Sequence, residues 1–150
     1  MPEEVGVILD NLKFIETSRY GDLELFSGEW INNKERKVLI TTTWSGWGKV
    51  SAARATTRLI SKKFQTLPVD ILLFTGVAGA VDKKLKQWDI VLSEFLIQHD
   101  MDARPIFDKY VIPALKKKNI TADKTILNNL YNNINAELQK GNLQIFGKIY

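Results

Sequence analysis

The sequence contains no cysteine and only one histidine among its 150 residues. The lack of cysteine excludes disulfide bonds and thiolate metal sites, and it is typical of proteins from a reducing compartment. Apolar runs such as 71–74 are too short to span a bilayer. The chain begins with acidic residues where a secretory signal would carry basic ones. We therefore expect a cytoplasmic protein that does not enter membranes.

Strong charge of one sign is also missing, since the formal net charge is +4. The only dense basic run, 116–118, has no interleaved aromatic residues of the kind that stack on nucleic-acid bases. We therefore expect no nucleic-acid partner. The length, with 45% hydrophobic and 25% charged residues, fits one globular domain over 1–150.

The order of helix-like and strand-like segments predicts an α/β fold. Helices are expected over 2–13, over 49–64 and after an N-cap at Thr121, and strands over 23–31, 37–43, 69–75, 89–98 and 143–150. Because 69–75 is almost entirely apolar, it is typical of a parallel strand covered on both faces. We predict a mixed, mainly parallel central sheet flanked by helices, with Val50, Ala53, Ile60 and Phe64 on one helix face. The chain starts on a helix and stops on an uncovered strand, so we expect the domain to be incomplete at both ends.

Two glycine-containing turns follow predicted strands. Residues 45–49, Ser-Gly-Trp-Gly-Lys, precede a helix N-terminus, which favours an anionic or polar ligand group. They match neither a P-loop nor a dinucleotide fingerprint. Residues 75–79, Thr-Gly-Val-Ala-Gly, lie where ligands bind in α/β sheets, or form a tight turn without a ligand. Trp47 is either a lid over a ligand or a plug in the core.

The stretch 99–102, His-Asp-Met-Asp, combines the single histidine with two carboxylates. Such a set could bind a cation. No further ligand cluster supports a metal site, so structural hydrogen bonding is the favoured interpretation. We expect neither a metal ion nor another cofactor.

Five segments, taken in order, resemble the methylthioadenosine/adenosylhomocysteine nucleosidases of the purine nucleoside phosphorylase superfamily. Residues 1–5 resemble that family's Met-Glu-Glu-Glu-Val, 45–49 its Ser-Gly-Ile-Gly-Lys, 75–79 its Thr-Gly-Ser-Ala-Gly, 88–93 its Gly-Asp-Ile-Val-Val-Ser, and 99–102 its Tyr-His-Asp-Ala-Asp stretch. The five segments are in register and span nearly the whole chain. The expected fold is therefore nucleoside phosphorylase-like.

The resemblance implies an enzyme that uses water to release adenine from 5′-methylthioadenosine or S-adenosylhomocysteine. By position, Glu4 is the carboxylate that activates water. The residues implied to line the nucleoside pocket are Trp47, Val77, Ala78 and Gly79. A loop with Ala103, Ile106 and Phe107 would reach the neighbouring subunit's 5′-alkylthio pocket, which implies a homodimer.

The sequence also departs from the family pattern. Val77 stands where the nucleosidases carry serine. The family's Met-Glu-Met-Glu segment, which holds the ribose, and its Ser-Asp segment, which supplies an acid to the purine, do not occur here. We therefore expect little or no activity from this chain alone, and a complementing C-terminal chain. The alternatives are a non-catalytic remnant that binds a nucleoside or dimerises, and a phosphate-dependent purine nucleoside phosphorylase using arginines such as Arg54, Arg58 and Arg104.

Overall fold

A computed structural model describes residues 2–31, 35–61 and 68–140 of the chain. These residues belong to two compact units, Met1–Ala78 and Gly79–Tyr150. The prediction of one domain over 1–150 stays a prediction. The last predicted strand, 143–150, and the end of the helix predicted over 49–64 lie outside the described residues.

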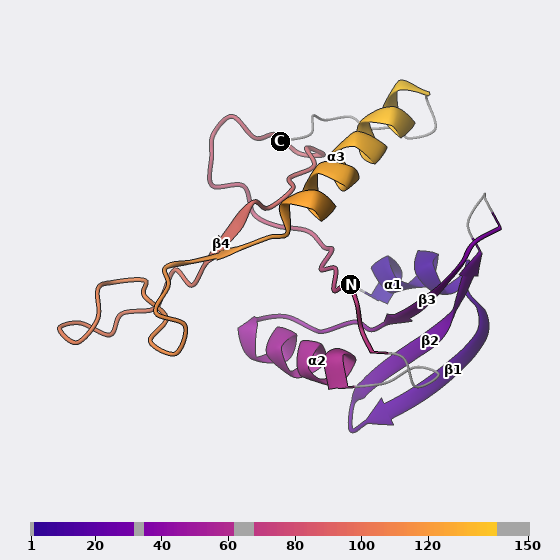
Figure 1. Cartoon of the computed structure of the whole chain (residues 1–150), viewed down its shortest axis with the longest axis horizontal. Coiled ribbons are helices and arrows are strands. Elements are labelled where there is room, and N and C mark those ends of the chain that lie inside the picture. The colour runs from indigo at the N-terminus through magenta and orange to yellow at the C-terminus, as the bar shows by residue number, and fades with distance from the viewer. Residues whose placement is uncertain (1, 32–34, 62–67, 141–150) are drawn as a thin grey trace. The chain divides into compact units, whose positions relative to one another are not determined.

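The first unit is built on a three-stranded antiparallel sheet in the order β1-β2-β3 (Figure 1). These strands are β1 (Lys13–Tyr20), β2 (Leu23–Ile31) and β3 (Lys37–Thr42). Gly21, in the two-residue turn between β1 and β2, has φ +66°. Such turns need a residue that tolerates positive φ. The strands predicted over 23–31 and 37–43 are confirmed to within one residue, whereas β1 was not predicted.

The core of this unit lies between the middle strand and one helix. Leu23 and Leu25 of β2 cluster with Ala55 of α2 (Lys49–Ser61), and all three are almost completely buried. On the same strand, the hydroxyl of the buried Ser27 forms a hydrogen bond of 2.9 Å with the hydroxyl of Thr41 of β3. This bond satisfies a hydroxyl that would otherwise be costly to bury. The alternating burial of β2 therefore gives the sheet one covered face.

Helix α2 turns a different side to the sheet from the one predicted. Val50 is 85% exposed, Ile60 is 56% exposed and Ala53 is also exposed. The side that contacts β2 carries Ala55, whose small side chain lets the helix backbone approach the strand closely. A neighbouring side holds Arg54, whose guanidinium donates two hydrogen bonds, of 2.6 and 3.1 Å, to the Asp22 carboxylate. This exposed pairing links the helix to the β1–β2 turn.

Helix α1 (Pro2–Leu9) is shorter than the predicted 2–13. Asn11 donates a side-chain hydrogen bond of 2.8 Å to the Val7 carbonyl, and the backbone N–H of Leu12 donates to the Leu9 carbonyl. These bonds satisfy carbonyls at the helix end. Leu12 is then buried, and β1 begins one residue later.

The predicted parallel strand over 69–75 is wrong for the described structure. These residues are exposed and form no ladder with other described residues. An apolar sequence does not make a strand without a neighbour that accepts its backbone hydrogen bonds. For the same reason, the expected parallel pairing is not seen, and each ladder between described strands is antiparallel.

Within its described residues, 79–140, the second unit contains a two-stranded ladder and one helix (Figure 1). Its elements are β4 (Phe95–Ile97), β5 (Asn119–Thr121) and α3 (Lys124–Gln139). Only 95–97 of the strand predicted over 89–98 is formed, whereas 99–118 is a long connection, as predicted. The predicted helix is present, but its N-cap is Asp123 and not Thr121. Thr121 belongs to β5, and the Asp123 carboxylate accepts a hydrogen bond of 2.9 Å from the Ile126 N–H.

Replacing Leu25 by alanine should lower the free energy of unfolding by about 2–5 kcal/mol, because Leu25 is fully buried and its removal leaves a cavity. Urea denaturation followed by circular dichroism measures this loss. Val38→Ala is the control, because Val38 is 46% exposed on β3 and its truncation should change stability by about 0.5 kcal/mol or less. Equal effects of the two substitutions would contradict the assigned core.

Gly28→Ala should also destabilise the first unit, by about 1–3 kcal/mol through overpacking. A Cβ added there would lie 2.9 Å from the Lys13 carbonyl oxygen and 3.1 Å from Cβ of Leu12. Gly6→Ala is the matched control, because a Cβ on this residue of α1 meets open space. Alanine favours a helix over glycine by about 0.5–1 kcal/mol, so Gly6→Ala should raise the denaturation midpoint.

Candidate functional site

The glycine turn before α2 has a backbone that depends on its glycines. Gly46 has φ +80° and Gly48 has φ +89°, a region that other residues rarely occupy. The carbonyl of Gly48 accepts a hydrogen bond of 3.0 Å from the Ala52 N–H and so starts the helix. The Ser45 hydroxyl donates a hydrogen bond of 3.0 Å to the Gly46 carbonyl. The turn therefore presents its central residue, Trp47, on a defined backbone.

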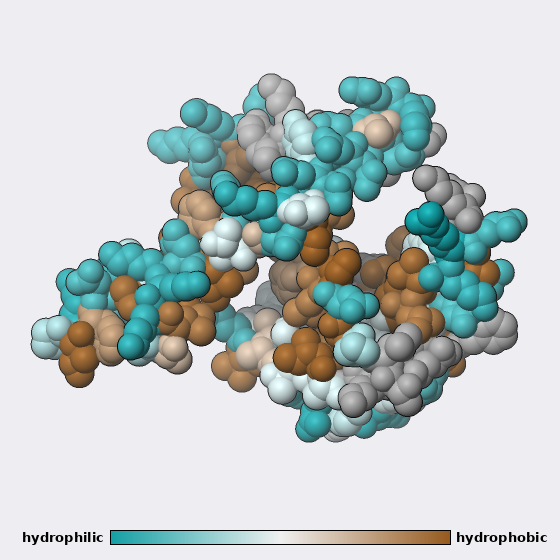
Figure 2. Space-filling model, viewed as in Figure 1, coloured by the Kyte–Doolittle hydropathy of each residue, from teal (hydrophilic) through white to brown (hydrophobic). Residues whose placement is uncertain are grey.

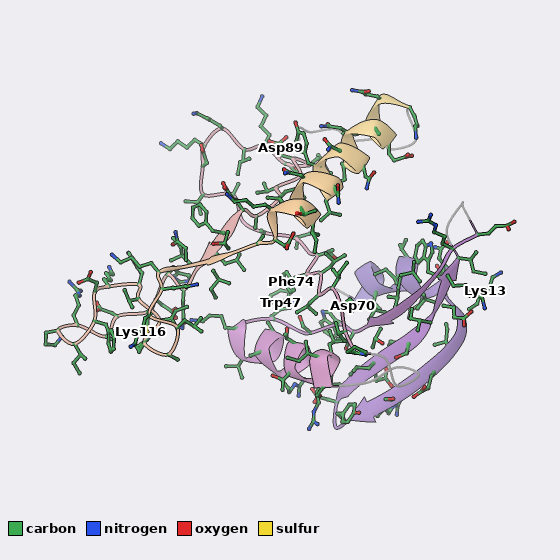
Figure 3. All side chains as sticks on the ribbon, viewed as in Figure 1. Lys13, Trp47, Asp70, Phe74, Asp89 and Lys116 are labelled. Atoms are coloured by element: carbon green, nitrogen blue, oxygen red, sulfur yellow. The ribbon has the colours of Figure 1, made fainter. Side chains whose placement is uncertain are left out.

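Trp47 is 84% exposed at the start of α2 (Figure 3). This exposure excludes a role as a plug in the described core. A large exposed indole offers an apolar and aromatic surface for a ligand or another chain. Its part in a nucleoside pocket stays a prediction.

The second glycine turn, 75–79, is also accessible. Val77 is 85% exposed, Ala78 is exposed, and a Cβ added to Gly79 would meet open space. A ligand could therefore approach the backbone N–H and C=O groups of these residues. Val77 and Ala78 belong to the first unit and Gly79 to the second. Their binding of a nucleoside stays a prediction.

The loop that follows β4 is held by one carboxylate. Asp102 accepts hydrogen bonds from the Arg104 backbone N–H at 3.2 Å, from Nε at 2.9 Å and from Nη2 at 2.5 Å. The side-chain hydrogen bonds from Arg104, followed by the backbone one, lower the pKa of the Asp102 carboxyl to about 2. The base of the loop is closed by a 2.8 Å hydrogen bond from the Tyr110 N–H to the Met101 carbonyl. This pairing was not predicted, although an aspartate two residues before an arginine is a usable signal for a local turn.

The three residues predicted to reach a neighbouring subunit all lie in this loop. The Ala103 carbonyl accepts hydrogen bonds of 3.1 Å from the N–H groups of Ile106 and Phe107. Ile106 is 82% exposed, whereas Ala103 and Phe107 are half-buried. The loop therefore presents an apolar side chain on a hydrogen-bonded turn.

The predicted catalytic carboxylate lies in the first unit. The backbone of Glu4 belongs to α1, but its side chain lies outside the described part of the structure. Its role as the residue that activates water stays a prediction.

The candidate phosphate-binding arginines are all engaged by their own chain. Arg54 is paired with Asp22 and Arg104 with Asp102, and in each pair the hydrogen bond raises the arginine pKa and lowers that of the carboxyl. Arg58 lies 4.6 Å from the centre of the Tyr20 ring. Each of these arginines therefore has a contact within its own chain.

Clusters of metal ligands, long apolar helices and surface recesses are three other kinds of feature that could mark a function in the described residues. No group of three or more histidine, aspartate or glutamate side chains in that part of the chain could hold a metal ion. No helix within the same residues is long and apolar enough to cross a membrane. A surface recess in the second unit contains none of the predicted site residues, and is lined by Leu115, Lys117, Asn119, Ile120 and Thr121.

Comparison with known families accounts for almost the whole chain. The family model described as Phosphorylase superfamily matches residues 1–146. The chain therefore belongs to the Phosphorylase superfamily.

The proteins to which the chain is similar include nucleosidases. A 5′-methylthioadenosine/S-adenosylhomocysteine nucleosidase of Staphylococcus saprophyticus is 36% identical over 104 residues, which are 69% of this chain and 42% of that protein. The crystal structure of such a nucleosidase from Colwellia psychrerythraea, in complex with adenine, matches 99% of this chain with a TM-score of 0.77 and 27% identity. The enzyme from Streptococcus pneumoniae, in complex with 8-aminoadenine, matches 99% with a TM-score of 0.70 and 27% identity. These matches confirm the α/β nucleoside phosphorylase-like fold and the resemblance inferred from the five segments.

The chain is much shorter than these relatives. It spans 42% of the Staphylococcus saprophyticus protein, 56% of the Colwellia structure and 57% of the Streptococcus structure. A large part of each relative thus has no counterpart in these 150 residues.

The Asp102 carboxyl should titrate near pH 2 in carbon-13 NMR, below its ordinary value of 3.8. Because the pKa is lowered in the folded loop, the pairing with Arg104 stabilises the loop above about pH 4 and is lost as the pH falls through about 2. Arg104→Gln removes the guanidinium donors and their charge but keeps the backbone N–H, so the Asp102 midpoint should rise part of the way toward 3.8. An unchanged midpoint in this variant would contradict the assigned cause.

Proposed function

We propose that this chain supplies the amino-terminal part of an enzyme that hydrolyses the N-glycosidic bond of 5′-methylthioadenosine or S-adenosylhomocysteine. The observation that carries the proposal is the match of 99% of the chain to nucleosidase structures at 27% identity. The two accessible glycine turns, 45–48 and 75–79, lie within that match. Adenine and adenine analogues bound to those relatives support a nucleoside as the small-molecule ligand.

The reaction requires a water molecule, a base and an acid. The bond between C1′ of the ribose and the purine nitrogen breaks as the water oxygen bonds to C1′. A carboxylate takes one proton from the water, and an acid gives one to the departing adenine. We assign the first role to Glu4, as the resemblance implies. Charge that develops on the ribose is stabilised by groups that hold its hydroxyls.

The pocket residues have separate roles in this proposal. Trp47 covers an apolar part of the ligand, and the backbone at Ala78 and Gly79 contacts the nucleoside. Val77 stands where the nucleosidases carry serine, so a polar contact near the water is absent. The exposure of the two turns supports this arrangement.

The homodimer belongs to the same proposal. Ile106 lies 82% exposed on the loop held by Asp102 and Arg104. An apolar side chain on a hydrogen-bonded turn is suited to enter an alkylthio pocket of a neighbouring subunit. Ala103 and Phe107 support the same turn from half-buried positions.

Hydrolysis is favoured over phosphorolysis by the state of the arginines. A phosphorylase would need cationic side chains directed at phosphate, whereas Arg54 and Arg104 each hold an aspartate of this chain and Arg58 lies over Tyr20. Adenine release that does not depend on phosphate would support hydrolysis. A rate that rises in proportion to phosphate would support the phosphorylase.

The second candidate function is a non-catalytic chain that binds a nucleoside or dimerises. Exposure of the apolar run 69–77 favours it, because a complete enzyme domain would cover such a surface. A non-catalytic chain should bind 5′-methylthioadenosine without releasing adenine, whether it is alone or in a complex. Isothermal titration calorimetry measures that binding, and an assay for free adenine measures the release.

The purified 150-residue chain alone should release little or no adenine from 5′-methylthioadenosine, because the family's purine-protonating and ribose-holding segments do not occur in it. High-performance liquid chromatography in phosphate-free buffer measures free adenine directly. Rapid turnover by the chain alone would mean that other residues fill those roles, and it would contradict the assignment of a partial site.

Glu4→Gln should lower adenine release by about 10²–10⁴-fold, the usual contribution of a general base. The assay uses the chain together with the portion of the Staphylococcus saprophyticus nucleosidase that it does not match. The neighbouring Glu3 on the same helix is the matched control, and Glu3→Gln should leave the rate within about twofold. Full activity of Glu4→Gln would overturn the catalytic assignment.

A further inference from the structure

The loop over 81–88 in the second unit carries apolar and basic side chains together at its surface. Val81 is 97% exposed, and Trp88 at the other end of the loop is 66% exposed. Between them lie three exposed lysines, Lys83, Lys84 and Lys86. Figure 1 draws this loop in pink, and Figure 2 shows hydrophilic residues, in teal, along its outer side. The loop thus presents two apolar side chains and three ammonium groups within eight residues.

Two short turns give the loop its shape. The N–H of Leu85 donates a hydrogen bond of 3.1 Å to the Asp82 carbonyl, and the N–H of Asp89 donates one of 3.1 Å to the Lys86 carbonyl. The carboxylates of Asp82 and Asp89 accept hydrogen bonds of 2.9 and 2.8 Å from the backbone N–H groups of Lys84 and Lys86. Asp89, labelled in Figure 3, marks the end of the second turn. The acidic side chains of the segment therefore stabilise its own backbone.

The three lysines of the loop have no anionic partner in the described part of the chain. None of them forms an ion pair with a residue that the structure describes. In the other basic run, 116–118, Lys118 lies 3.8 Å from the Asp108 carboxylate, and no aromatic residue interrupts that run. Unpaired ammonium groups on an exposed loop are complementary to an anionic surface.

Trp88 occupies a backbone conformation that a bulky side chain does not favour. Its φ is +76°, in the left-handed region where glycine is the usual residue. The nucleosidase segment that 88–93 resembles has glycine at this position. Because Trp88 is largely exposed, its indole adds little to a core. Contact with another molecule therefore accounts for this tryptophan better than the fold of the loop does.

We propose that the 81–88 loop docks on the surface of a lipid bilayer that carries anionic headgroups. Indole rings favour the headgroup level, where the ring is partly desolvated and its N–H stays in polar surroundings. In the proposed contact Val81 lies at the boundary with the acyl chains, and the lysines lie beside the anionic headgroups. The contact involves no membrane-spanning segment, and it does not depend on the proposed nucleosidase function.

The size and composition of the loop favour a bilayer over a macromolecular partner. A stable protein interface involves about 20–30 residues on each side, whereas the exposed set here lies within one loop. Single-stranded nucleic acid stacks successive bases on several aromatic side chains, and this loop has only Trp88. A bilayer accepts a short segment, because buried apolar area and electrostatic attraction to anionic lipids both add to the affinity.

The test is cosedimentation of the 150-residue chain with vesicles of phosphatidylcholine, prepared with and without phosphatidylserine. We expect binding to the vesicles that contain phosphatidylserine and at least tenfold weaker binding to those without it. Raising the ionic strength from about 0.1 to about 1 M shortens the screening length from about 10 to about 3 Å, so it should release the chain. Binding should also shift the tryptophan emission to shorter wavelength.

Replacing Lys83, Lys84 and Lys86 together by glutamine should weaken vesicle binding at least tenfold, because each lysine near an anionic surface contributes about fivefold to the affinity. The matched control replaces the three lysines of 116–118 by glutamine, which removes the same charge from the same unit. It should leave the affinity within about threefold. Equal losses for the two triple variants would mean that net charge alone governs binding, and would overturn the proposal.

Trp88→Gly should weaken vesicle binding at least fivefold and keep the turn, because glycine favours the positive φ of residue 88. Circular dichroism checks that the fold is kept. Trp88→Phe retains an aromatic ring, so it should bind within about threefold of the unchanged chain but lose the shift in tryptophan emission. A shift that persists in Trp88→Phe would place another tryptophan at the bilayer and overturn the proposal.

Several further outcomes would overturn it as well. Equal binding to both kinds of vesicle would exclude a role for headgroup charge, and no binding to either would exclude the bilayer. Loop-dependent binding only to single-stranded oligothymidylate, or only to polyglutamate, would assign the loop to nucleic acid or to an acidic polypeptide. Free inorganic phosphate should not displace the chain from vesicles at the same phosphate concentration, since it offers no surface to Trp88 and Val81. Full displacement would assign the lysines to a free anion.

Discussion

Contact between β2 and α2 is the constraint on which the first unit depends. Leu23 and Leu25 lie on the covered face of the middle strand, and Ala55 brings the helix close enough to cover them. Two polar pairs lie around this small core. The hydrogen bond between Ser27 and Thr41 joins two strands, and the one from Arg54 to Asp22 joins the helix to the hairpin turn. The glycine turn that carries Trp47 is attached directly to the start of this helix. The position of the turn is therefore set by the burial of two leucines and not by the turn itself.

The second unit is ordered in another way. None of the α3 residues is fully buried, and the residues of β4 and β5 are exposed. Local hydrogen bonds hold its segments in place. Asp123 accepts one at the start of α3, and Asp102 accepts one in the loop after β4. Units held by short-range polar contacts open at a lower free-energy cost than packed cores. Residues 103–107 are thus held by local hydrogen bonds, in a unit whose described residues form little core.

The parts that could be predicted from the sequence are those whose signals are local. The prediction of paired strands over 23–31 and 37–43 identified β2 and β3, and the apolar spacing over 127–138 identified α3. Edge strand β1 was missed because its polar and apolar residues do not alternate, although the Gly21-Asp22 turn signal was present. Thr121 was chosen as an N-cap because a hydroxyl can cap a helix, but its place in β5 leaves that role to Asp123. The five family segments were recognised, whereas strand pairing over 69–75 could not be, since it depends on a partner that sequence periodicity does not reveal.

The exposed run 69–77 also has a consequence for the life of the protein in a cell. Neutral, apolar segments with high strand propensity are the sequences that nucleate aggregation and that chaperones and proteases recognise. The apolar sequence that would stabilise a buried strand thus exposes the chain to aggregation and degradation for as long as that segment stays uncovered.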